Sequence, residues 1–210
     1  RQNNIGDREG LKYLPDGPEG PEVHTPEAFK KIYQVVKDSG YVGATMPTQY
    51  GGGGAPFTTA ILAGEVGIAS NMAFYMGPGL SHGAMKTILK KATEELKDKY
   101  LPNMTSGEWM GTMCLTEPQC GTDLGLIKTT AKPVDNHYEL NGQKIWISFG
   151  EHDLTENIIH LVLARTPDAP AGIKGISLFL VPKRLDDNSR NPIFCGCLLY
   201  TSPSPRDTNE

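Results

Sequence analysis

The chain has no long apolar run and no excess of charge of one sign. Of its 210 residues, 38% are hydrophobic, but no stretch approaches the roughly 18 consecutive apolar residues that a membrane-spanning helix needs. Twenty Lys and Arg stand against 24 Asp and Glu, a formal net charge of −4. That balance gives no electrostatic footprint for nucleic acid or an anionic membrane. We therefore expect a globular protein with neither partner.

Cysteine is also scarce. Four cysteines in 210 residues do not make a disulfide scaffold, which favours a reducing, cytoplasmic location. Cys114 and Cys120 have no histidine near them in sequence, as a zinc site would need. We expect buried thiols at these two positions and no metal site.

The first part of the chain carries helix signals after a polar start. Residues 1–24 are rich in Gly and Pro and are predicted to be loop. Thr25 is expected to cap the first helix, with Pro26 in the first helical position. Gly40 is a natural end for that helix.

Further helices are predicted up to about residue 100. The helix after Pro56 is apolar enough to be largely buried. Gly77-Pro78-Gly79 is expected to interrupt the next helix, and residues 102–107 to form a linker. His82 could be a base, but a packed or capping histidine is the preferred interpretation, because no carboxylate partner is identifiable.

After Gly107 the hydrophobic period changes from helical to alternating. Asn141-Gly142 is a strong signal for a type I′ turn between two strands. The sequence thus predicts an α+β fold, with a helical domain in residues 1–108 and an antiparallel β-domain in residues 109–194. The predicted strands are 109–116, 126–134, 138–140, 144–148, 157–165 and 175–182.

The stretch Met113-Cys-Leu-Thr-Glu-Pro-Gln-Cys-Gly-Thr-Asp123 runs from a strand into a turn. Pro118 ends the strand because it has no N–H to donate. At Gly121 and Thr122, backbone amides can lie bare beside a hydroxyl, which suits a phosphate or another anion.

A second stretch, Lys144-Ile-Trp-Ile-Ser148, follows two dozen residues later. Trp146 offers a large flat indole, and Ser148 lies two residues on, which is the same face of a predicted strand. A flat apolar wall beside a hydroxyl suits the edge of a planar heterocycle. We expect the two stretches to lie side by side.

These two stretches resemble the flavin-contacting segments of the acyl-CoA dehydrogenases, and the similarity extends from about Gly6 to about Lys183. Asn71-Met-Ala-Phe and Gly150-Glu-His-Asp-Leu-Thr-Glu-Asn resemble in particular the bacterial branch that contains 3-methylmercaptopropionyl-CoA dehydrogenase. The resemblance implies FAD as the cofactor, with Thr122 also approaching the substrate. The resemblance implies that Met113, Leu115 and Thr116 line the flavin ring and that Gly121 and Thr122 meet the pyrophosphate. It also implies that Trp146, Ile147 and Ser148 form the wall beside the isoalloxazine.

The resemblance also implies a reaction. A short or medium acyl-CoA, with 3-methylthiopropionyl-CoA as one candidate, would lose an α-proton to a base and a β-hydride to FAD. Electrons would pass to an electron-transfer flavoprotein, and the full-length protein would be a homo-oligomer. The catalytic base is expected in a C-terminal four-helix domain that these residues do not contain, so the chain is interpreted as an inactive fragment. The alternatives are an acyl-CoA oxidase and a non-catalytic relative that binds flavin or a partner.

Two groups of charged residues could be mistaken for catalytic ones. Glu117 belongs to the first motif, and a structural, loop-fixing role is predicted for it. Glu151, His152 and Asp153 resemble an acid–base cluster, but solvation or salt bridges are the preferred interpretation. Phe149 stands where the resembling branch has a smaller residue, which could reshape the acyl pocket.

The end of the chain, residues 195–210, lies outside the resemblance. Residues 197–207 resemble the translation of a transposon-end adapter used in DNA sequencing. The alternative is a genuine Ser/Pro-rich disordered tail.

Overall fold

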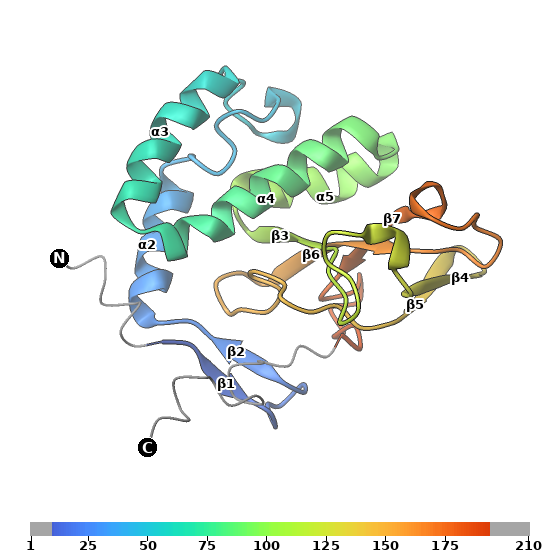
Figure 1. Ribbon diagram of the computed structural model, residues 1–210. Coiled ribbons are helices and arrows are strands. Elements are labelled where there is room, and N and C mark those ends of the chain that lie inside the picture. Colours follow the sequence, from blue (N-terminus) through green and yellow to red (C-terminus); the bar gives the residue numbers. More distant parts are fainter. Residues whose placement is uncertain (1–9, 194–210) are drawn as a thin grey trace.

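The computed structural model describes residues 10–193. Helices lie on one side of a small sheet, and a separate β-hairpin stands at each end of the molecule (Figure 1). The order along the chain is mainly helical first and then mainly strand, so the predicted α+β class is confirmed. The expectations about the tail at 195–210 lie outside the described residues.

The helical layer consists of four α-helices in the described part of the chain. The first ends as predicted, with Gly40 in the left-handed region at φ 70°. Its start differs: Pro26 is the N-cap residue, and the Thr25 hydroxyl donates instead to Asp153 Oδ1 at 2.6 Å. The four helices are α2 (Glu27–Asp38), α3 (Phe57–Ser70), α4 (Met72–Lys91) and α5 (Glu94–Ser106).

Two proline positions were predicted wrongly. Helix α4 continues through Pro78, and α5 continues through Pro102, where a break and a linker were expected. Each proline removes one backbone hydrogen bond from its helix. Both helices are packed against the sheet, and Gly77 and Pro78 are themselves buried. Tertiary burial therefore outweighs the local preference of the proline.

The sheet has the order β3-β6-β7, with β6 in the middle. Strand β6 pairs antiparallel with β7 but parallel with β3, from Trp109↔Asn157 to Cys114↔Val162. The expected antiparallel pairing is thus present between β6 and β7 but not between β3 and β6. A parallel pair needs a crossover connection. The connection from β3 to β6 consists of the loops at 115–129 and 142–156 and of the hairpin of residues 130–141 between them. The three strands are β3 (Trp109–Cys114), β6 (Asn157–Ala164) and β7 (Ser177–Pro182).

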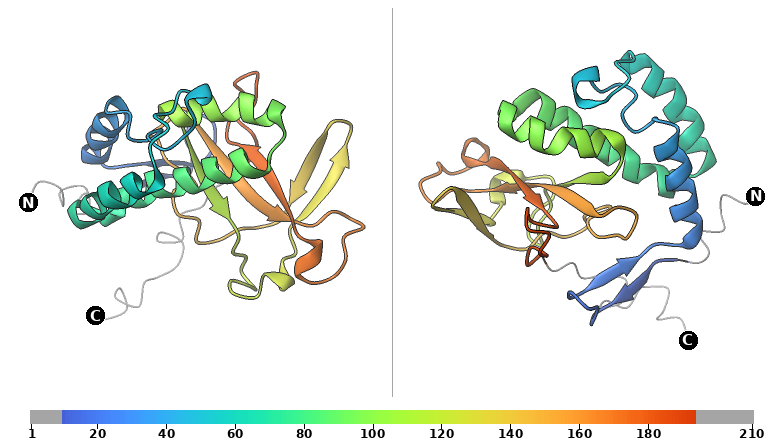
Figure 2. Two further views of the ribbon diagram at one scale, coloured as in Figure 1. Left: turned by 90° about the horizontal axis from the view of Figure 1, so that it is seen from above. Right: turned by 180° about the vertical axis from the view of Figure 1, so that it is seen from behind.

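Two hairpins lie outside this sheet. Strands β4 (Thr130–Val134) and β5 (His137–Asn141) are joined at Asp135-Asn136, with Asp135 at φ 48°. The predicted turn at Asn141-Gly142 is wrong, because Asn141 is the last residue of β5. Strands β1 (Lys12–Leu14) and β2 (Glu22–His24) form a hairpin in a region expected to be loop (Figure 2).

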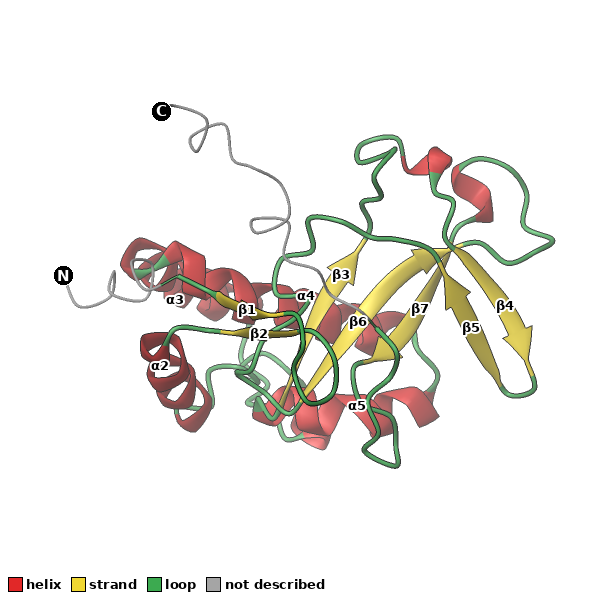
Figure 3. Ribbon diagram, turned by 90° about the horizontal axis from the view of Figure 1, so that it is seen from below, coloured by secondary structure: helices red, strands yellow, loops and turns green. Residues whose placement is uncertain are grey.

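The main core lies between α4, α5 and one face of the sheet (Figure 3). Met85, Leu101 and Met104 from the helices meet Ile159 and Leu161 from β6, and all five are at most 1% exposed. This packing fixes β6, which pairs with β3, the strand whose end leads into the first predicted motif.

Helix α3 is much more exposed than predicted. Ile61, Leu62 and Val66 are 58%, 68% and 68% exposed, and Gly64 is the buried residue of this helix. The apolar composition of α3 is thus not matched by burial of its side chains within these 210 residues. Of the helices in residues 10–193, none combines the length and the apolar character needed to cross a membrane.

Candidate functional site

The structure brings the two predicted motifs together. The Ile145 N–H donates to the carbonyl oxygen of Thr116 at 2.9 Å. The Lys144 ammonium donates to the carbonyl oxygen of Leu115 at 3.1 Å. The first motif leaves the carboxyl end of β3, and the second lies directly beside it. Trp146 and the Thr116 backbone are therefore parts of one surface.

The second motif is a loop, so the predicted strand at 144–148 is wrong. Trp146 has φ 59° and Phe149 has φ 53°, both in the left-handed region. The Trp146 side chain is 71% exposed. Ser148 is exposed too. Its exposure does not come from the strand alternation that was predicted, because the segment is not a strand. The carbonyl groups of Ser148 and Gly150 accept hydrogen bonds from side chains of the sheet and not from a neighbouring strand.

Two buried side chains of the sheet hold the loop. Thr112 and His160 face each other across β3 and β6 and are 1% and 4% exposed. The Thr112 hydroxyl donates to the carbonyl oxygen of Ser148 at 2.7 Å. His160 Nε2 donates to the carbonyl oxygen of Gly150 at 2.7 Å. Burial lowers the pKa of His160. Sequence reasoning missed both residues, because each sits inside an ordinary apolar strand pattern.

The first motif forms a closed turn followed by free donors. Glu117 and Cys120 exchange backbone hydrogen bonds of 2.9 and 3.0 Å. Within residues 10–193, the N–H groups of the next two residues, Gly121 and Thr122, meet no acceptor. Both residues are exposed. The predicted pair of bare amides is therefore present, in a form that fits an anion.

The hydroxyl groups at this surface are also available. In the described part of the chain, the side chains of Thr116, Thr122 and Ser148 make no hydrogen bond. Of the remaining predicted residues, Met113 is half-buried against the main core, and Leu115 and Ile147 are half-buried. The surface thus combines an exposed indole, three free hydroxyls and two free amides. This set fits a planar heterocycle that carries a phosphate group.

Glu117 is 3% exposed and is held by many donors. Lys144 Nζ and the N–H groups of Lys128 and Thr129 donate to its carboxylate at 2.8, 2.7 and 3.1 Å. Burial by itself would raise the pKa of Glu117, but the hydrogen bonds from Lys144, Thr129 and Lys128, with one from Gln119, outweigh it and lower the pKa to about 2. This geometry agrees with the predicted loop-fixing role.

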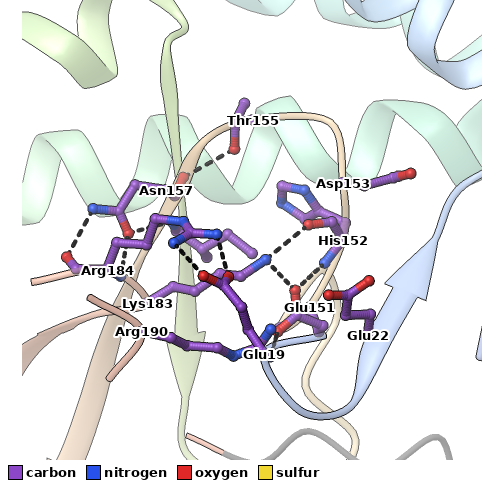
Figure 4. Close-up of polar contacts among 12 residues, drawn as sticks. Glu19, Glu22, Glu151, His152, Asp153, Thr155, Asn157, Lys183, Arg184 and Arg190 are labelled. Carbon is purple, nitrogen blue, oxygen red and sulfur yellow. Dashed lines mark hydrogen bonds and ion pairs between the residues drawn. The ribbon is translucent and has the colours of Figure 1, made fainter. Parts of the chain in front are cut away.

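A polar cleft of about 670 Å³ lies between the β1–β2 hairpin, the loop at 151–156 and the end of β7 (Figure 4). Glu151 forms ion pairs with Lys183 and, at 2.9 Å, with Arg190. Asp153 pairs with Lys30 at 2.8 Å. The expected salt bridges are therefore present, whereas the alternative of solvation is wrong for Glu151, whose side chain is 5% exposed.

His152 is buried between this cleft and Phe149. Burial, with a smaller effect from Lys183, lowers its pKa to about 3. Its Nδ1 accepts from the Leu154 N–H at 3.2 Å. Its Nε2 is buried without a hydrogen-bond partner among the described residues, and the ring meets Phe149 edge to face. The imidazole is thus neutral and packed, which does not suit an acid or base at this place.

A second cavity, of about 440 Å³, lies between α3, α4 and residues 41–45. Its wall is mostly apolar, and His82 stacks on Phe57 there with ring centroids 5.9 Å apart. The packed histidine was expected. The predicted flavin residues line neither this cavity nor the polar cleft. They form an open surface at the end of β3.

Comparison with known proteins matches two family models to this chain. The N-terminal domain of acyl-CoA dehydrogenase matches residues 18–108, and the middle domain matches residues 112–193. The 3-methylmercaptopropionyl-CoA dehydrogenase of Ruegeria pomeroyi is 42% identical over 202 residues, which cover 93% of this chain and 34% of the relative. A butyryl-CoA dehydrogenase of Syntrophomonas wolfei is 40% identical over 183 residues, covering 86% and 30%.

Solved structures show the same architecture. Glutaryl-CoA dehydrogenase from Mycobacterium smegmatis in complex with FADH2 superposes with a TM-score of 0.62 at 27% identity, covering 73% of this chain and 37% of that one. The chain spans about a third of the length of the curated relatives it matches.

Proposed function

Because the chain belongs to the acyl-CoA dehydrogenase family, we propose that it forms one wall of an FAD site in an enzyme that α,β-dehydrogenates acyl-CoA thioesters. One observation carries the proposal: the two motifs meet at the end of β3 and leave an indole, hydroxyls and amides free on one surface. The relatives named above support an acyl-CoA substrate of short or medium chain, with 3-methylthiopropionyl-CoA as a candidate.

Each part of the surface has a role in this proposal. The Trp146 indole would cover a flat apolar ring, with Leu115 and Ile147 beside it. The hydroxyls of Thr116 and Ser148 would bond to the polar edge of that ring. The N–H groups of Gly121 and Thr122 would hold the pyrophosphate, because converging amides favour an anion. Bound FAD would supply the hydride acceptor.

The Thr122 hydroxyl is proposed to face the thioester. An electron-transfer flavoprotein as the electron acceptor, a homo-oligomeric assembly and a cytoplasmic location are further parts of the proposal. They rest on the family alone.

No catalytic base is assigned at this surface among residues 10–193. Glu117 belongs to the first motif, but its low pKa and its several donors leave it ionised and occupied. An α-proton acceptor needs a free carboxylate within reach of the substrate. A relative that binds flavin without turnover is the alternative function.

The test is a titration of FAD into the 210-residue chain. A Trp109→Phe variant leaves Trp146 as the single tryptophan, so its emission reports on the proposed site alone. We expect saturable quenching of Trp146 by FAD and weaker quenching by riboflavin, which lacks the pyrophosphate. Equal, unsaturable quenching by both compounds would overturn the proposed FAD site.

Chemistry is tested in a longer product of the same gene. Anaerobic addition of butyryl-CoA should bleach the flavin absorbance of a dehydrogenase and leave that of a non-catalytic binder unchanged. Rapid oxygen consumption during turnover would indicate an oxidase instead. The 210-residue chain itself should show no turnover.

A further inference from the structure

We infer that Lys144, through its ion pair with Glu117, is the positioning residue that fixes the loop of residues 143–149, called here the Trp146 loop, against the first motif in a flavin-binding arrangement. The inference rests on the proposed function and deepens it. Lys144 itself would not touch the flavin.

The contacts of Lys144 are those of a clamp. Its ammonium donates to Glu117 Oε1 at 2.8 Å and to the carbonyl oxygen of Leu115 at 3.1 Å. The side chains of Lys144 and Glu117 are 11% and 3% exposed. A buried charge-assisted pair of this kind is stronger and more directional than a surface ion pair. One side chain of the loop thus bonds to two points of the first motif.

The Glu117 end of the clamp is rigid without Lys144. Its carboxylate also accepts from the N–H groups of Lys128 and Thr129. The backbone of Thr129 is in turn bonded to Arg165, at the end of β6, by a 2.9 Å hydrogen bond. Glu117 therefore belongs to the frame of the sheet, and Lys144 attaches the loop to that frame.

The loop has few other attachments. Among the described residues, the backbone of residues 143–149 donates one hydrogen bond, from Ile145 to Thr116. Lys144 and Ser148 stand two residues before and two residues after Trp146, and Ser148 is bonded to Thr112. The exposed indole, at a backbone φ of 59°, is thus held from both sides. Without the Lys144 side chain, only the hydrogen bond from Ile145 to Thr116 would hold the loop on the side before Trp146.

The same domain offers a matched control. Lys183 pairs with Glu151 in the polar cleft, and the two side chains are 12% and 5% exposed (Figure 4). This pair has the burial of the Lys144–Glu117 pair, but the Lys183 ammonium bonds to Glu151 and His152, which follow residues 143–149, and not to those residues themselves. Loss of Lys144 leaves the buried Glu117 carboxylate without a cation, whereas loss of Lys183 leaves Glu151 paired with Arg190 alone. The Lys183 variant therefore controls for the loss of a buried lysine ion pair in this domain.

The experiment compares Lys144→Met, Lys144→Arg and Lys183→Met, each in the Trp109→Phe background. FAD affinity is measured from Trp146 quenching. Hydrogen exchange of the peptide covering residues 143–149 is measured without FAD. Lys144→Met should weaken FAD binding at least tenfold and speed exchange of the Ile145 amide. Lys144→Arg should restore most of both properties. Lys183→Met should lower thermal stability but leave FAD affinity and loop exchange unchanged.

Equal effects of Lys144→Met and Lys183→Met on loop exchange and FAD affinity would overturn the inference. If the Lys144→Met variant does not fold, the double variant Glu117→Gln/Lys144→Met takes its place in the comparison. The double variant removes both charges of the ion pair. That variant should keep the fold and lose FAD affinity, and wild-type affinity in it would equally overturn the inference. If the parent chain binds no FAD, the proposed function fails, while the exchange of Ile145 still decides whether Lys144 positions the loop.

Discussion

The hydroxyl of Thr112 donates to the carbonyl oxygen of Ser148 at 2.7 Å, which joins a strand interior to an exposed loop. Thr112 is 1% exposed and lies in β3. Ser148 is two residues from Trp146, in the surface proposed to bind the flavin. A buried position of the sheet therefore sets the place of a residue at the candidate site.

Replacement of Thr112 by Val should loosen the loop without disturbing the core. The two side chains have nearly the same shape, so the change removes mainly one hydrogen bond, worth about 1 kcal/mol of unfolding free energy. Urea unfolding measures that loss. We also expect several-fold weaker quenching of Trp146 by FAD. Thr130→Val is the control, since the Thr130 hydroxyl makes a longer bond of 3.4 Å at the surface. Identical behaviour of the two variants would contradict the role of Thr112.

The stability of the chain should fall in acid through Glu117. Its pKa is lowered from 4.5 to about 2 in the folded protein, so the unfolded chain takes up the proton first as the pH falls. The stabilisation is fully present above about pH 4.5 and is lost as the pH falls toward 2, by an amount on the order of 3 kcal/mol. Denaturant unfolding at several pH values measures the slope.

Glu117→Gln is the control for this acid dependence. The variant has no carboxyl group at position 117, so its unfolding free energy should change less between pH 4.5 and pH 2. Asp153, whose pKa is also lowered, titrates in both proteins. An unchanged slope in the variant would exclude Glu117 as the source.

Gly77 should be sensitive to substitution and Gly79 should not. A Cβ at Gly77 would come within 2.7 Å of the Phe149 ring and 2.8 Å of the Met110 methyl, whereas one at Gly79 meets nothing within 4 Å. Both lie in α4, where Ala is preferred to Gly by about 1 kcal/mol. Gly79→Ala should therefore stabilise the chain by up to that amount, and Gly77→Ala should destabilise it. Thermal unfolding of both variants tests this difference, and equal midpoints would refute the close packing of Phe149 on α4.

The exposure of α3 predicts a large contrast between two leucines. Leu62 in α3 is 68% exposed, and Leu101 in α5 is 0% exposed. Leu62→Ala should change the unfolding free energy of the 210-residue chain by less than about 0.5 kcal/mol. Leu101→Ala should cost about 2–5 kcal/mol, because it opens a cavity in the main core. A large loss for Leu62→Ala would mean that α3 is covered in solution.

Local sequence signals predicted well wherever a short segment decides its own structure. The order of helices before strands, the end of α2 at Gly40 and the free amides at Gly121 and Thr122 are all local properties. The buried thiols of Cys114 and Cys120 were also expected. In each case a few neighbouring residues suffice, because backbone preference and hydrophobic period act over one or two turns of chain.

The wrong predictions share the opposite property. Pro78 stays inside a helix because that helix is pressed on the sheet, and β3 runs parallel to β6 because of a long crossover. The segment 144–148 has the alternation of a strand, yet it pairs with no strand in the part of the chain that the structure describes. These outcomes depend on partners distant in sequence, which no local pattern encodes.

The sequence by itself determined the α+β class, the family and the residue types available for a flavin: an indole, hydroxyls and glycine-flanked amides. Only the tertiary structure decided that these groups share a surface. Thr112, His160 and the Lys144–Glu117 pair bring them together. The physical reason is that each residue type has its own hydrogen-bonding groups. Which partner such a group meets depends on how strands and loops that are distant in the chain pack together.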